Sequence, residues 1–179
     1  MTGTARPAEE QQLAWFHGLP AGQARELLLA CCAAGRWAGR LAAARPYPDL
    51  TALLRESDEA VAGLSERELA AALAGHPRIG ERVPAAAGSR SAGWSRQEQS
   101  GVAAADDPTR HALADLSAAY EQRFGHIYLV CATGRSAAEL LALLRARLGH
   151  DDATEWRVVR SELQQINRIR LRKLLAGAG

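Results

Sequence analysis

Apolar residues recur every three or four positions along most of this 179-residue chain, which is the spacing of one buried helix face. The stretch 20–35 opens with Pro20 and closes at Gly35, and its apolar positions share one face. Residues 45–49 (RPYPD) form a turn, and residues 49–64 show the same helical spacing. The pattern predicts a mostly helical protein.

Three Ser-x-x-Glu motifs mark further helix starts, because the serine and glutamate of a capping box each bond a free backbone N–H. They are Ser65–Glu68, Ser95–Glu98 and Ser136–Glu139. We expect the first of these helices to stop at Gly75 and the second to run through SRQEQSGVAAA. The third should cover SAAELLALLRARLG.

The rest of the chain divides into two more helices, a loop and one irregular stretch. Helical spacing continues from 108 to about 123 and from about 152 to 175. Prolines and glycines make residues 76–94 a loop. A continuous apolar run then interrupts the helical pattern, and residues 127–132 within it are expected to form a strand or an extended segment.

Composition fits a bundle of helices. Hydrophobic residues make up 47% of the chain and charged residues 23%, which is typical of soluble globular proteins. Aromatic residues are few and alanine is abundant, which favours close-packed helices. We predict an all-α, single-domain multi-helix bundle over residues 1–179, with residues 1–8 as a flexible N-terminal segment.

Net charge and cysteine content indicate which classes of binding partner and which cellular compartment to expect. The net charge is +2 and the arginines are scattered, so nothing indicates a nucleic-acid partner. Cys31, Cys32 and Cys131 form no Cys-x-x-Cys motif, which indicates free thiols in a reducing compartment and no metal site. No apolar run approaches 18 residues and the N-terminus lacks the apolar core of a signal peptide. We expect a cytoplasmic protein with no membrane partner.

The stretch GHPRIGE places His76 between a helix-ending glycine and Pro77. Most single histidines are structural, but a proline restricts the backbone of the residue before it. His76 should therefore be held rigidly at the mouth of a loop, where functional groups concentrate. No His, Asp or Cys lies at metal-ligand spacing from it, so acid–base chemistry is favoured over metal binding.

Ser95 and Glu98 have two compatible interpretations. The simpler one is the capping box. The N-terminus of a helix also attracts anionic groups through its free N–H groups. A binding site there would use the same two side chains, and Gln99 beside them could hold an amide-rich ligand.

Arg170 stands out on the last helix. Five apolar residues of that helix fall within an arc of about 80° at 100° per residue, and Arg170 falls at its centre. An arginine in an apolar stripe must find a carboxylate, a ligand or a path to solvent. Burial against an anionic group and extension to solvent both remain open.

Residues 127–132 can be read as core alone. Extended backbone between helices, however, leaves N–H and C=O groups that need partners. A flat heterocyclic ligand is one possible partner.

Five segments, in order along the chain, resemble the family of 2-oxo-4-hydroxy-4-carboxy-5-ureidoimidazoline (OHCU) decarboxylases. They are RPYPDL, HPRIGE, SRQEQSGV, RFGHIYLVCATGRSAAELLALLRARL and INRIRLRKLL. Each motif alone is weak, but five in register are specific. Many members of the family read His-Pro-Asp-Leu-Ala and Phe-Gly-Phe-Pro-Phe where this chain reads His-Pro-Arg-Ile-Gly and Phe-Gly-His-Ile-Tyr. The catalytic positions are unchanged by these differences.

The resemblance implies a cofactor-independent enzyme, commonly a homodimer, that converts OHCU to (S)-allantoin in the last step from urate. It implies His76 as the acid–base residue and Glu98 as a second catalytic residue. The substrate-binding residues that it implies are Pro77, Ser95, Gln99, Tyr128, Leu129, Val130, Cys131, Ala132 and Arg170. An arginine that gripped the leaving carboxylate would stabilise the ground state, so we expect Arg170 to contact another part of the substrate.

The alternative is a helical binding module without catalysis. Such a module would bind its partner through the last helix. This requires that four arginines of that helix form one continuous basic face: Arg157, Arg160, Arg168 and Arg172. Binding that weakens steeply with salt would favour it.

Overall fold

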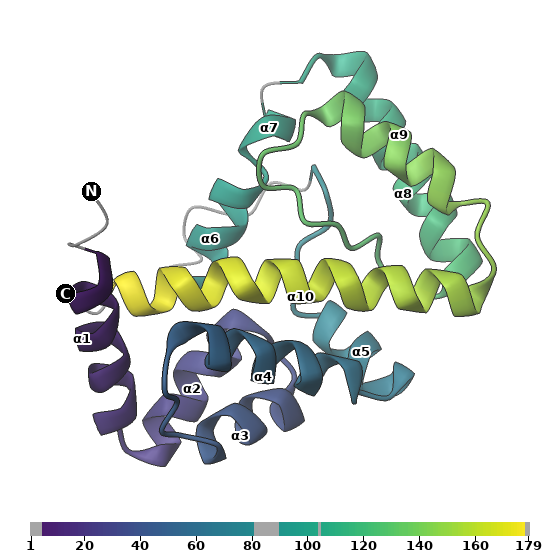
Figure 1. Ribbon diagram of the computed structural model, residues 1–179. Coiled ribbons are helices and arrows are strands. Elements are labelled where there is room, and N and C mark those ends of the chain that lie inside the picture. Colours follow the sequence, from purple (N-terminus) through teal and green to yellow (C-terminus); the bar gives the residue numbers. More distant parts are fainter. Residues whose placement is uncertain (1–4, 81–89, 104, 178–179) are drawn as a thin grey trace.

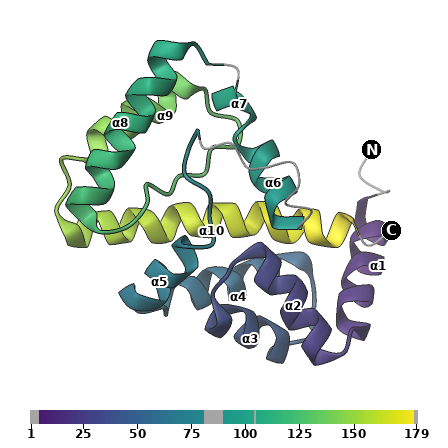
Figure 2. The ribbon, with the colours of Figure 1, turned by 180° about the vertical axis from the view of Figure 1, so that it is seen from behind.

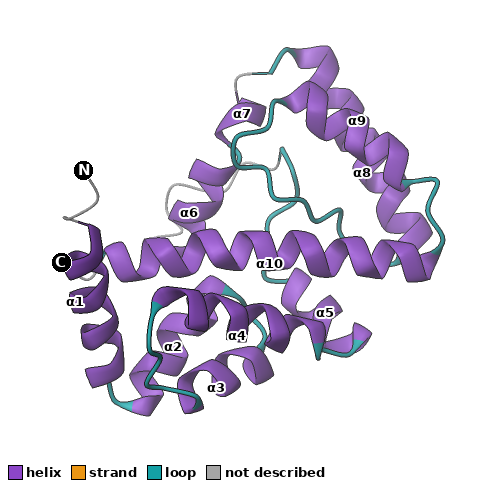
Figure 3. Cartoon of the chain, viewed as in Figure 1, coloured by secondary structure: helices purple, strands orange, loops and turns teal. Residues whose placement is uncertain are grey.

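A computed structural model describes residues 5–80, 90–103 and 105–177. All of its regular secondary structure in those ranges is helical (Figures 1 and 3). The helices are α1 (Ala5–Gly18), α2 (Ala21–Cys31), α3 (Gly35–Ala43), α4 (Leu50–Ala62), α5 (Glu66–Leu73), α6 (Arg90–Glu98), α7 (Ser100–Ala103), α8 (Asp107–Phe124), α9 (Ala137–Arg147) and α10 (Asp152–Ala176). The predicted all-α fold is confirmed.

The long helix α10 crosses the middle of the molecule, with α1–α5 on one side and α6–α9 on the other (Figures 1 and 2). The apolar residues form two clusters. The larger one joins α1–α5 to α10, and the smaller one is built mainly from α8 and α9. The described helices include none long and apolar enough to cross a membrane.

The segment 127–132 runs between these two clusters and contains no strand. Its side chains alternate: Leu129 and Cys131 are buried in the larger cluster, while Tyr128, Val130 and Ala132 are buried in the smaller one. Alternation with a period of two is the behaviour of extended backbone. The expected extended segment is therefore present, and it joins the two cores.

Two of the three predicted capping boxes are confirmed. Ser65 and Glu68 start α5, and Ser136 and Glu139 start α9, each with both reciprocal bonds formed. Asp106 and Asp151 cap α8 and α10 in the simpler way, by accepting a backbone N–H three residues later.

The third capping box is wrong. Helix α6 already begins at Arg90, so Ser95 lies within the helix and cannot be its N-cap. The Ser95 hydroxyl instead accepts a hydrogen bond from Arg170, and Glu98 pairs with the same guanidinium. The tertiary contact with Arg170 therefore replaces the capping-box hydrogen bonds that were expected of Ser95 and Glu98.

One other predicted boundary needs correction. The helix expected over 20–35 ends at Cys31, and Gly35 begins α3 instead of closing α2. Helix α1 begins at Ala5, inside the range 1–8 for which a flexible segment was expected. Residues 1–4 lie outside the described residues, as do residues 81–89 of the predicted loop 76–94. Residues 90–94 of that predicted loop belong to α6 instead.

Candidate active site

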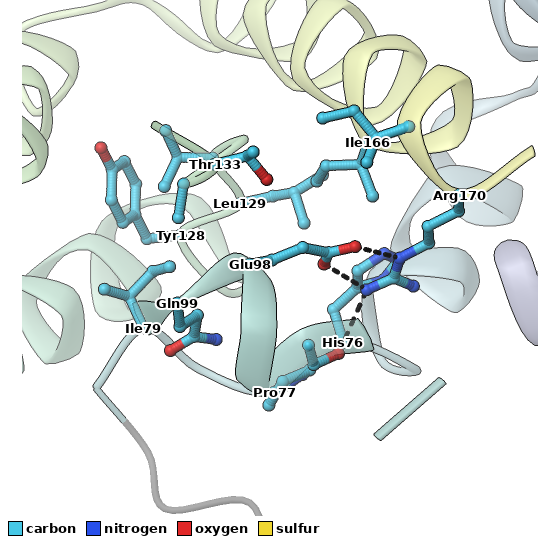
Figure 4. A pocket seen from close by; sticks show the side chains of 14 residues that line it. His76, Pro77, Ile79, Glu98, Gln99, Tyr128, Leu129, Thr133, Ile166 and Arg170 are labelled. Carbon is cyan, nitrogen blue, oxygen red and sulfur yellow. Dashed lines mark hydrogen bonds and ion pairs between the residues drawn. The ribbon is translucent and has the colours of Figure 1, made fainter. Parts of the chain in front are cut away.

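Three parts of the chain meet beside α10 and form a pocket (Figure 4). They are the turn after α5, the helix α6 and the extended segment. The lining residues are His76, Pro77, Ile79, Ser95, Glu98, Gln99, Tyr128, Leu129, Val130, Ala132, Thr133, Ile166, Ile169 and Arg170. Segments more than 90 residues apart in sequence therefore contribute to one site.

The backbone just before His76 packs closely against the connection between α2 and α3. A Cβ atom on Gly75 would lie 2.7 Å from the Cβ of Ala33, so only glycine allows this approach. Helix α5 ends at Leu73, and the His76 N–H donates to the Leu73 carbonyl at 2.9 Å. Gly75 is therefore needed for the close approach to Ala33. It lies two residues beyond the end of α5, so it is not the last residue of that helix.

The two ring nitrogens of His76 have different environments. Nδ1 lies 3.1 Å from the Ala72 carbonyl oxygen, which can only accept, so Nδ1 carries the proton. Nε2 is shielded from solvent and has no hydrogen-bond partner among the described residues. In this tautomer Nε2 offers a lone pair to any ligand in the pocket.

Burial of the ring, and then the positive charge of Arg170, lower the pKa of His76 from 6.5 to about 4. His76 is therefore neutral at pH 7. A neutral imidazole can take a proton from a ligand and return it elsewhere, which is the behaviour of a general base that becomes a general acid.

Arg170 is held by acceptors from two helices, and Figure 4 shows its pair with Glu98. Its Nε and Nη2 donate to the two carboxylate oxygens of Glu98 at 3.0 and 2.8 Å, which is a bidentate pair. Nη2 also donates to the Ser95 hydroxyl at 3.1 Å, and Nη1 donates to the Cys31 carbonyl at the end of α2, also at 3.1 Å. The buried anion-binding interpretation of Arg170 is correct, and the anion in this structure is Glu98.

Gln99 holds the turn that carries His76. Its Oε1 accepts the Gly80 N–H at 3.0 Å, and its Nε2 donates to the Arg78 carbonyl at 3.3 Å. Both ends of its amide are therefore engaged with residues 78–80. Gln99 therefore lines the pocket and also holds the turn after His76 in place.

The extended segment is held from behind by charged side chains. Arg147 on α9 donates through Nη1 to the Leu129 carbonyl at 2.7 Å. Glu162 on α10 accepts the Cys131 N–H at 2.8 Å. These two contacts fix a stretch of backbone that has no helical ladder to support it.

The structure brings ten of the eleven predicted site residues into the pocket lining. The exception is Cys131, whose side chain lies in the larger core and whose N–H is bonded to Glu162. Arg78 and Arg135 stay outside the lining and pair with Glu121 and Glu162.

Four lining residues were not predicted: Ile79, Thr133, Ile166 and Ile169. Ile166 could have been identified because it lies one turn before Arg170 on the apolar face. In residues 5–80, 90–103 and 105–177, no group of three or more His, Cys, Asp or Glu side chains could hold a metal ion.

The buried His76 should make stability depend on pH. Its pKa is about 4 in the folded state and 6.5 when unfolded, so protonation favours unfolding. Its effect on stability is nil well above pH 6.5. As the pH falls from 6.5 to 4, the protein should lose up to about 3 kcal/mol. Urea unfolding across this range, compared with His76→Gln, measures the difference. If the free energy of unfolding changed equally with pH in the two proteins, the predicted effect of His76 would be contradicted.

Comparison with known proteins gives one consistent result. The model of the OHCU decarboxylase family matches residues 17–172. The uric acid degradation bifunctional protein TTL of Arabidopsis thaliana is 26% identical over 147 residues, which is 82% of this chain and 45% of that protein. An OHCU decarboxylase from Amia calva is 30% identical over 79 residues, or 44% of this chain and 45% of that protein. The chain thus matches about half the length of these curated relatives.

Two solved structures have a similar fold. An OHCU decarboxylase crystallised in the presence of (S)-allantoin superposes with a TM-score of 0.71 at 21% identity, covering 83% of this chain and 96% of that one. An (S)-allantoin synthase superposes with a TM-score of 0.66 at 15% identity, covering 90% of this chain and 53% of that one.

Proposed function

This chain belongs to the OHCU decarboxylase family, and on that premise we propose that it converts OHCU to (S)-allantoin and CO₂ without a cofactor. The observation that carries the proposal is the convergence of His76, Glu98, Gln99 and Arg170 in one pocket lined by main chain. The resemblance to proteins named for urate degradation and for (S)-allantoin supports the same assignment.

The substrate supplies its own electron sink. A ring carbon carries both the hydroxyl and the carboxylate, and a C=N bond lies next to it. When the bond to the carboxylate breaks, CO₂ leaves, and the electron pair flows into the imine, whose nitrogen takes up a proton. The hydroxyl proton must then move to the neighbouring carbon, so that a carbonyl and a C–H bond replace the enol.

His76 is suited to that second proton transfer. Its free Nε2 takes the hydroxyl proton and then delivers it to one face of the neighbouring carbon. Delivery to a single face yields a single enantiomer, whereas OHCU left in water decays to racemic allantoin. Glu98 and Arg170 form the polar wall of the pocket, and Pro77 packs beside His76.

The main chain of the extended segment would hold the flat ring and its ureido group. Val130 and Ala132 line the pocket, and their backbone can offer N–H donors and C=O acceptors to an amide-rich ligand. We further propose a cytoplasmic location, in keeping with the free thiols at Cys31, Cys32 and Cys131. A homodimer is proposed from the family resemblance alone.

The last helix does not favour the alternative of a binding module. Arg168 pairs with Asp58 on α4, and Arg160 donates to the Leu64 carbonyl at 3.2 Å. These arginines attach α10 to its neighbours, so they do not form one free basic face.

The test is to generate OHCU in place from urate, with urate oxidase and hydroxyisourate hydrolase, and to follow circular dichroism. We expect an (S)-allantoin signal that grows much faster with this protein than without it. Slow, optically silent decay at the same rate in both samples would overturn the decarboxylase assignment.

A further inference from the structure

Among the described residues that line the pocket, Arg170 is the one cation and Glu98 is the one anion, and their charges neutralise each other. Arg170 and Glu98 are 3% and 9% exposed, and no other lining residue carries a formal charge while His76 is neutral. A guanidinium has five N–H donors. Four hydrogen bonds to Glu98, Ser95 and Cys31 engage four of them.

The remaining cations near the site are also paired. Arg78 bonds Glu121 through Nε and Nη2 at 2.7 and 3.0 Å, on the side of the turn that faces α8. Arg135 lies 3.5 Å from a carboxylate oxygen of Glu162. Among the described residues, the pocket therefore presents polar groups without net positive charge.

This balance matters for a substrate that must lose a carboxylate. A free guanidinium would hold the carboxylate in an ionic contact, and that contact disappears when CO₂ forms. Such a contact would stabilise the ground state more than the transition state and would slow the reaction.

We propose that Glu98 neutralises Arg170 so that the pocket recognises the ureide part of its ligand and does not grip a carboxylate. This inference rests on the proposed function. It gives Glu98 a role in specificity: it makes the site discriminate against anionic ligands. Ser95 and the Cys31 carbonyl hold the guanidinium in the orientation that keeps the pair bidentate.

The test compares a neutral ureide, allantoin, with an anionic one, allantoate, by calorimetric titration. In Glu98→Gln the side-chain shape is kept, but the charge on Arg170 is no longer balanced. We expect the affinity for allantoate to rise about tenfold or more, because a charge-assisted contact becomes available. The affinity for allantoin should change by only a few-fold.

Two further variants separate charge in the pocket from charge elsewhere. Asp58→Asn also removes one carboxylate that pairs with an arginine of α10, but that pair lies outside the pocket, so allantoate affinity should not change. The double variant Glu98→Gln/Arg170→Gln removes both charges and should lose the tenfold gain. Thermal melts of each protein check that it is folded.

Several outcomes would overturn the inference. A folded Glu98→Gln protein that binds allantoin without a gain for allantoate contradicts it while leaving the decarboxylase assignment intact. Should that variant not fold, the wild-type protein decides: tighter binding of allantoate than of allantoin, weakening with salt, contradicts the inference. If the wild-type protein binds neither ureide and makes no (S)-allantoin, the proposed function fails and the inference fails with it.

Discussion

Replacing His76 with alanine should strongly reduce enzymatic formation of (S)-allantoin and leave the fold intact. General acid–base catalysis by a positioned side chain contributes about 10² to 10⁴ in rate, so kcat should fall by about that factor. The fold should survive because, among the described residues, the ring makes one side-chain hydrogen bond, to the Ala72 carbonyl, and leaves a buried nitrogen without a partner. Removing that nitrogen costs little stability.

The measurement is the dichroic signal of (S)-allantoin from OHCU made in place. His111→Ala is the matched control, because His111 is exposed on α8 outside the pocket lining. We expect full activity in that control and only racemic, optically silent product with His76→Ala. Normal turnover by the His76 variant would show that His76 is not the acid–base residue, and Glu98 would then be the candidate for that role.

Replacing Arg147 with methionine should have the largest effect on stability. Glu155 on α10 is 0% exposed, and its carboxylate accepts hydrogen bonds from Arg147, from the Tyr120 hydroxyl and from His150 Nδ1. Without the guanidinium, a buried carboxylate loses its positive partner. Breaking such a pair costs about 3–5 kcal/mol.

The same substitution should weaken substrate binding, because Arg147 also fixes the Leu129 carbonyl behind the pocket. We expect KM to rise more than kcat falls. Urea unfolding and steady-state kinetics measure the two effects. The control is Arg145→Met, two residues earlier on α9 at an exposed position. Equal stability of the two variants would show that the Arg147–Glu155 pair is not needed for the fold.

Sequence periodicity predicted the helices well because most of them bury one continuous face. It also singled out Arg170, since a charged residue at the centre of an apolar arc needs either a partner or a path to solvent. The same reasoning applies to Arg147, which follows Leu140 and Leu144 on the buried face of α9. This second buried arginine was not predicted from the sequence.

Local motifs could not separate Ser95 from Ser65 and Ser136, because all three sit in the same Ser-x-x-Glu pattern. The difference comes from α10, where Arg170 lies more than 70 residues away in sequence and claims both side chains. In the same way, the apolar run 127–132 indicated extended backbone, but nothing local shows that its two faces enter two different cores. Such features depend on contacts that only the folded chain provides.

The two-sided burial of that segment limits how the chain can evolve. Inserting or deleting one residue between Ile127 and Ala132 would exchange the faces of every side chain beyond the change, sending Val130 into the space shaped for Leu129 and Cys131. Most loops tolerate changes in length. The length of this segment, however, is fixed because its side chains pack into both apolar clusters. Insertions and deletions should therefore accumulate elsewhere in the chain. In proteins with this fold, the segment equivalent to residues 127–132 should keep its length.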